Sequence, residues 1–192
     1  RIILVGLITL MVAGVVLLMG GGPPVAERLG LTPFHFVNRQ AMHLAMALVV
    51  FGFVACLPPR HIRRLSLLVF VLSLVLIYLA LQYGQEVKGA RRWISIAGMT
   101  IQPSEFLKPA FVVLTAWAFA EGARRKDMPG TLLALLILPT AIVPLILQPD
   151  FGQTMLVTLV WAGLFFIAGL HWFWVIGLGG AGAFGILAAY QF

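Results

Sequence analysis

The chain has 192 residues, of which 61% are hydrophobic and 10% are charged, with 13 Lys and Arg against 6 Asp and Glu. Soluble domains carry about 25% charged residues, and a soluble fold of this size could not bury so much apolar surface in one core. We therefore exclude an ordinary soluble protein and expect the net charge of +7 to serve lipid phosphates, with no nucleic-acid partner.

Seven apolar runs, separated by short polar breaks, follow one another along the chain. A helix needs about 20 apolar residues to cross the hydrocarbon, so each run is predicted to be a transmembrane helix. The runs lie near Ile2 to Gly20, Gln40 to Leu57, Leu65 to Tyr83, Ser104 to Ala120, Thr131 to Leu147, Gly152 to Leu170 and Trp172 to Tyr190. The expected fold is an all-α integral membrane protein, a polytopic helix bundle that forms a single membrane domain over residues 1–192.

Compact basic breaks at residues 58–64 and 121–130 set the predicted orientation. Together with Arg1 they place seven positive residues on one side of the membrane, against six on the other. Cytoplasmic loops carry the excess of Lys and Arg, so we place these breaks inside. The connections after the third and fifth runs then lie at the outer face.

Two patterns that suggest chemistry are better explained by structure. Residues 177–182 read GLGGAG and formally match a dinucleotide fingerprint, but they lie within an apolar run without a βαβ unit. Gly177, Ala181 and Gly185 recur every four residues, which favours close packing of membrane helices. The four histidines lack metal-ligand spacing, so neither a nucleotide site nor a metal site is predicted.

Polar residues concentrate in the connection between the third and fourth runs. Anchoring at the headgroups explains such a gathering of Lys, Arg and Trp without any further function. Ser104 is expected to cap the fourth helix, and Glu105 in its first turn suits the helix dipole. Lys108 needs a partner, which is either Glu105 on the same helix face or a ligand in a wet cavity.

A second polar point, Gln148-Pro149-Asp150, precedes the sixth run and repeats the pattern Gln102-Pro103-Ser104. Asp150 can be a simple helix cap. Alternatively, two helix N-termini share one face with nearby cations and suit a phosphate or pyrophosphate. The candidate binding or cavity residues are Lys88, Arg91, Arg92, Trp93, Gln102, Ser104, Glu105, Lys108, Gln148 and Asp150.

At these residues the chain resembles the SEDS family (shape, elongation, division and sporulation proteins), which includes FtsW and RodA. The resemblance rests on KGARRWI at residues 88–94, QPSEF with Lys108 at residues 102–108, and QPDFGQT at residues 148–154. It covers essentially the whole chain, and residues 165–172 are more similar to the division branch FtsW than to RodA. The family fold has ten spans. Because the chain begins without Met and ends in an apolar run, we expect an N-terminal fragment with the first seven spans.

The resemblance implies a peptidoglycan glycosyltransferase that polymerises lipid II at the outer face of the bacterial cytoplasmic membrane during division. It also implies a class B penicillin-binding protein as partner, other division proteins, and location at the septum. The family's best candidate for the catalytic aspartate lies after the seventh span, beyond Phe192, so we assign no catalytic residue here. The sequence identifies no cofactor and leaves a divalent cation open.

Two other functions are compatible with the same residues. A flippase would carry lipid II across the membrane and would need polar access from both faces, which the cytoplasmic breaks do not suggest. A non-catalytic division scaffold would have little use for Lys108 at membrane depth. Both stay open as alternatives to the enzyme.

Overall fold

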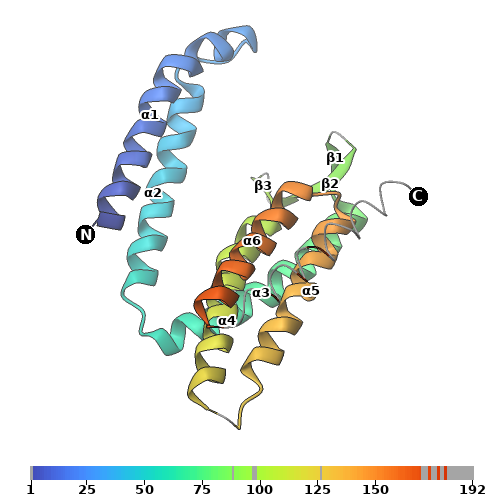
Figure 1. The fold of residues 1–192 in the computed structure, drawn as a ribbon. Coiled ribbons are helices and arrows are strands. Elements are labelled where there is room, and N and C mark those ends of the chain that lie inside the picture. Colours follow the sequence, from blue (N-terminus) through green and yellow to red (C-terminus); the bar gives the residue numbers. More distant parts are fainter. Residues whose placement is uncertain are drawn as a thin grey trace. The chain divides into compact units, whose positions relative to one another are not determined.

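The computed structural model describes residues 2–87, 89–96, 99–125 and 127–169, together with Phe173, Gly177 and Gly180. Within this part, six helices and three strands follow one another along the chain (Figure 1). They are α1 (Ile2–Arg28), α2 (His35–Ala55), α3 (Pro59–Tyr83), β1 (Gln85–Val87), β2 (Ala90–Ile96), β3 (Met99–Ile101), α4 (Pro103–Arg124), α5 (Gly130–Leu147) and α6 (Phe151–Ile167). The predicted seventh span lies outside the described residues, apart from the three single positions.

Five of these helices, α1 to α5, are long and apolar enough to cross a membrane, and α6 is a shorter apolar helix. This confirms the predicted polytopic helix bundle. The chain divides into two compact units, residues 1–58 and residues 59–192.

The first unit consists of α1 packed against α2. The first span was expected to end near Gly20, but α1 continues through three glycines and through Pro23 and Pro24 to Arg28. In lipid the backbone must satisfy its own hydrogen bonds, so an apolar helix tolerates residues that would end it in water. Nearly all side chains of this unit are exposed, and α2 has no buried residue.

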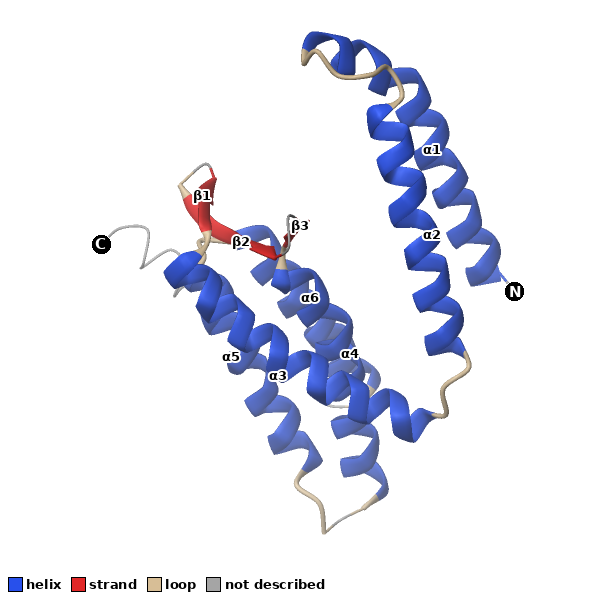
Figure 2. Ribbon diagram, turned by 180° about the vertical axis from the view of Figure 1, so that it is seen from behind, coloured by secondary structure: helices blue, strands red, loops and turns tan. Residues whose placement is uncertain are grey.

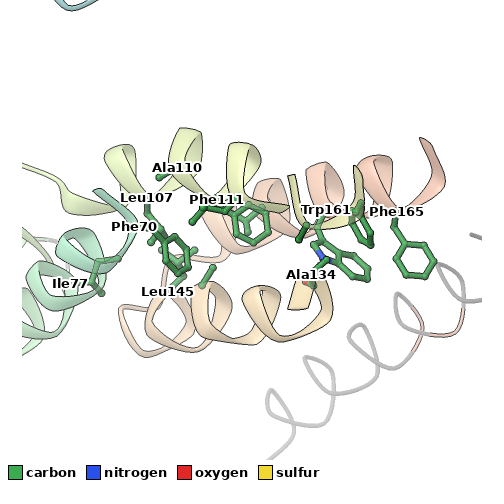
Figure 3. Packing of buried hydrophobic residues seen from close by; sticks show 14 residues of the cluster. Phe70, Ile77, Leu107, Ala110, Phe111, Ala134, Leu145, Trp161 and Phe165 are labelled. Carbon is green, nitrogen blue, oxygen red and sulfur yellow. The ribbon is translucent and has the colours of Figure 1, made fainter. Parts of the chain in front are cut away.

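The second unit packs α3, α4, α5 and α6 around one hydrophobic core, in which α4 is central (Figure 3). Leu107, Phe111, Leu114 and Ala118 recur every three or four residues and form the buried face of α4. Trp161 of α6 donates a hydrogen bond from its indole nitrogen to the carbonyl oxygen of Ala134 in α5, at 2.9 Å. This hydrogen bond fixes α6 against α5.

Strands β1, β2 and β3 form an antiparallel sheet in that order. Val87 pairs with Ala90, and Ile96 pairs with Met99. Figure 2 shows the sheet at the end of the second unit where α3 ends and α4 begins, away from the α4–α5 connection. No sheet was predicted in this polar connection, because its strands are too short for a clear alternation of polar and apolar residues.

At the other end of the unit, α4 and α5 approach each other at two glycines. A Cβ atom added to Gly130 would lie 2.2 Å from the carbonyl oxygen of Ala118 and 2.6 Å from Cα of Gly122. Backbone atoms cannot move aside as a flexible side chain does. Only glycine therefore fits at position 130.

Gly130→Ala is expected to lower the free energy of unfolding by about 1–3 kcal/mol, the usual range for overpacking. The measurement is equilibrium unfolding of the purified chain in mixed micelles. The matched control is Gly163→Ala in α6, where an added Cβ meets nothing within 4 Å. Equal stability of the two variants would contradict the predicted close approach.

Candidate functional site

Polar side chains from several parts of the second unit meet at the end that carries the sheet. They come from β1 and β2, from the start of α4, from the α5–α6 turn and from the first turn of α6. We call this group the polar network; it comprises Glu86, Arg91, Arg92, Gln102, Ser104, Glu105, Lys108, Gln148, Asp150 and Gln153.

Arg92 connects strand β2 to the α5–α6 turn through three contacts. Its Nη1 lies 3.5 Å from Oδ1 of Asp150, while Nε and Nη2 donate to the carbonyl oxygens of Gln148 and Pro149 at 3.3 and 2.7 Å. Gln148 returns a hydrogen bond from Nε2 to the carbonyl oxygen of Arg91 at 3.1 Å. The Asp150 side chain is only 7% exposed. A planar guanidinium with several engaged donors fixes both partners in orientation.

Glu105 connects the first turns of α4 and α6. Its Oε2 lies 2.8 Å from Nζ of Lys108, and its Oε1 accepts a hydrogen bond from Nε2 of Gln153 at 3.1 Å. The predicted pairing of Lys108 with Glu105 is therefore present. The Glu105 side chain is 50% exposed, so water can compete for this ion pair.

The two helix N-termini meet as expected, but they are capped differently. Asp150 caps α6, since its Oδ1 accepts from the backbone N–H of Gln153 at 3.5 Å. Ser104 was expected to cap α4 and does not: α4 begins at Pro103, and Gln102 occupies the cap position without a side-chain cap bond. Proline suits the first helical position because it has no N–H to satisfy there.

The described cations of the polar network are all paired with carboxylates. Arg91 lies 3.6 Å from Glu86, and Arg92 and Lys108 pair with Asp150 and Glu105. The strength of the pairs differs. Arg91 and Lys108 each hold one partly exposed carboxylate, whereas Arg92 also binds two carbonyl oxygens. An incoming anion can therefore displace the first two pairs more easily than the third.

Three buried oxygens of the network accept no hydrogen bond from the part of the chain that is described. They are Oε1 of Gln148, Oδ2 of Asp150 and Oε1 of Gln153. An unsatisfied buried acceptor costs about 1–3 kcal/mol, so such atoms are well suited to bind hydroxyl or amide donors of a ligand. The described residues hold no group of three His, Cys, Asp or Glu that could bind a metal ion.

Eight of the ten predicted site residues belong to the polar network. Trp93 lies half-buried in β2, where it pairs with Gln85, and Lys88 lies outside the described residues. Gln153 and Glu86 were not predicted. The signal for Gln153 was its position three residues after the Asp150 cap, the spacing of a capping box. The Gln153 side chain donates to Glu105 instead.

The family model for FtsW, RodA and SpoVE, described as cell cycle proteins, matches residues 1–191. A probable peptidoglycan glycosyltransferase FtsW of Caulobacter vibrioides is 38% identical over 183 residues, which cover 94% of this chain and 47% of that protein. Its counterpart in Acinetobacter baylyi is 30% identical over 84% of this chain and 41% of its own length. The chain thus spans about half the length of the curated relatives it matches.

Two solved structures have the same fold. The rod shape determining protein RodA of Thermus thermophilus matches with a TM-score of 0.65 and 27% identity, over 92% of this chain and 58% of that one. A chain of a peptidoglycan synthase complex, described as coordinating polymerization and crosslinking, matches with a TM-score of 0.70 and 27% identity. That match covers 95% of this chain and 52% of the other.

Arg92→Gln is expected to lower the free energy of unfolding by about 1–3 kcal/mol, because it leaves a nearly buried Asp150 carboxylate without its ion pair. Hydrogen exchange of the β2 amides should accelerate as well. Both can be measured on the purified chain in micelles. The neighbouring Arg91→Gln serves as control, since it removes only an exposed pair and should cost about 1 kcal/mol or less. Equal effects of the two variants would contradict a special role for Arg92.

Proposed function

The chain belongs to the FtsW/RodA/SpoVE family, and from this premise we propose that the whole protein is a peptidoglycan glycosyltransferase. It polymerises lipid II into glycan strands at the outer face of the bacterial cytoplasmic membrane. The proposal extends to division, with the septum as location. The names of the curated relatives support the reaction class.

The observation that carries this proposal is the meeting of two helix N-termini with paired cations at one end of a membrane bundle. Glu105 of α4 and Gln153 of α6 are hydrogen-bonded across the two first turns. Helix N-termini bind phosphate groups through free N–H groups and the helix dipole. A lipid-linked pyrophosphate needs such an anion site next to the hydrocarbon in which its tail lies.

In the proposed reaction, a sugar hydroxyl oxygen of one lipid II bonds to the anomeric carbon of the growing strand. The bond from that carbon to the undecaprenyl pyrophosphate breaks, and the pyrophosphate leaves with the electron pair. The hydroxyl proton goes to a base, which we assign to none of the described residues. Negative charge develops on the leaving pyrophosphate, where cations stabilise the transition state.

The network residues have different proposed roles. Lys108 moves from Glu105 to the pyrophosphate, because its flexible stem and partly exposed pair permit the exchange. Gln153 then keeps the Glu105 carboxylate in place. Arg92 stays bound to Asp150 and acts as a positioning residue for β2, so it does not bind substrate.

A class B penicillin-binding protein is the proposed partner, with other division proteins. The support is the similarity to a chain of a synthase complex that coordinates polymerization and crosslinking. A polymerase needs a crosslinking enzyme to join its strands, which fits such a pair.

Lys108→Ala is expected to reduce glycan-strand formation from purified lipid II about 10²-fold, the usual cost of one transition-state contact. The assay uses the full-length protein with its penicillin-binding partner. Asp150→Ala should abolish polymer formation, because loss of the Arg92–Asp150 ion pair misplaces β2. Arg125→Gln is the control: it lies at the opposite end of α4 in an exposed pair with Glu121 and should polymerise at the wild-type rate.

Two results would count against the proposed function. Wild-type rates for Lys108→Ala would remove the polar network from the reaction. Absence of polymer from the wild type, with lipid II crossing a vesicle membrane instead, would favour the flippase. A scaffold would show neither activity.

A further inference from the structure

A second group of cations lies at the end of the second unit away from the polar network. A pocket of about 310 Å³ opens between the first turns of α3 and the C-terminal half of α4. We call it the arginine pocket; its lining residues are Arg60, Arg63, Arg64, Leu67, Leu114 and Trp117. Figure 2 shows the start of α3 at the end of the unit opposite the sheet.

The three arginines of this pocket are uncompensated. Among the described residues, none of them forms an ion pair with a carboxylate, in contrast to Arg91, Arg92 and Lys108 at the other end. Arg63 instead lies over the Trp117 ring, 5.7 Å from its centroid. Three guanidinium groups close together repel one another, so an anion between them is favourable.

The pocket combines this charge with an apolar wall. Leu67 and Leu68, one turn after the arginines, are 55% and 62% exposed in a helix that is apolar enough to cross the membrane. The arginines therefore lie at headgroup level, while the exposed Leu67 and Leu68 face the start of the hydrocarbon. Trp117 is a typical interface residue, and its buried indole N–H has no acceptor among the described residues.

A second, larger pocket lacks this combination. The pocket of about 450 Å³ between α1 and α2 is lined by apolar side chains alone. It has no group that would select one lipid headgroup from another. Charge and apolar wall together point to a ligand that has an anionic head and a hydrocarbon tail.

We propose that the arginine pocket binds an anionic phospholipid of the adjacent leaflet. The headgroup phosphate lies between Arg60, Arg63 and Arg64, and the first part of an acyl chain lies along the exposed side chain of Leu67. A free phosphate would use the arginines but would gain nothing from the apolar wall. This site is independent of the proposed polymerase activity.

The test measures phospholipid binding to the purified full chain by native mass spectrometry in detergent. The probes are phosphatidylglycerol, phosphatidylcholine and soluble glycerol phosphate. The variant replaces Arg60, Arg63 and Arg64 by Gln. The matched control replaces Arg28, Arg39 and Arg124 by Gln, which removes the same net charge from exposed positions outside the pocket.

The wild type and the control are expected to bind phosphatidylglycerol at least tenfold more tightly than phosphatidylcholine. The pocket variant should lose this preference, because each Arg near an anionic surface contributes about a fivefold factor in affinity. Circular dichroism verifies that all three proteins are folded.

Three results would overturn the proposal. In the first, the pocket variant keeps its preference for phosphatidylglycerol. In the second, the control loses that preference to the same extent as the pocket variant. In the third, glycerol phosphate displaces the lipid at matched concentration. The last result would identify a site for free phosphate. If the pocket variant fails to fold, single Gln replacements at the exposed Arg60 and Arg64 give the same test, with a loss of several-fold each.

Discussion

The contact between Arg92 and the α5–α6 turn is the interaction on which the candidate site depends. It joins a short strand, which has little stability of its own, to the N-terminus of a membrane helix. The hydrogen bond from Gln148 back to strand β2 reinforces it. Without the Arg92 contacts, the Gln148 bond alone, among the described residues, would hold β2 at the turn that precedes α6.

The two ends of the second unit use charge in different ways. At the sheet, each described cation is paired with a carboxylate, so the network orients its members and presents the weakly held cations of Arg91 and Lys108 to a ligand. At the other end, the arginines of α3 form no ion pair with any described carboxylate, and they lie beside an apolar wall. Lipid accounts for both patterns, because charge is tolerated only at the ends of the helices.

Hydropathy alone predicted the helices, since lipid demands long apolar runs, and the repeated Gln-Pro pattern predicted that α4 and α6 begin at one face. Neither pattern predicted the sheet, because its strands have only three, seven and three residues. The sequence also could not show that Arg92 binds Asp150, because the two residues lie 58 positions apart along the chain. Ser104 was misplaced as a cap because the preceding proline begins the helix one residue earlier.

A double-mutant cycle between Arg92 and Asp150 tests the account most directly. The free energies of unfolding of Arg92→Gln, Asp150→Asn and the double variant are compared with that of the wild type, and Asn retains the helix cap. If the Arg92–Asp150 contact holds β2 at the α5–α6 turn, the coupling free energy between the two side chains is expected to be about 1–3 kcal/mol. Additive effects, with a coupling free energy near zero, would contradict it and would separate the sheet from the site.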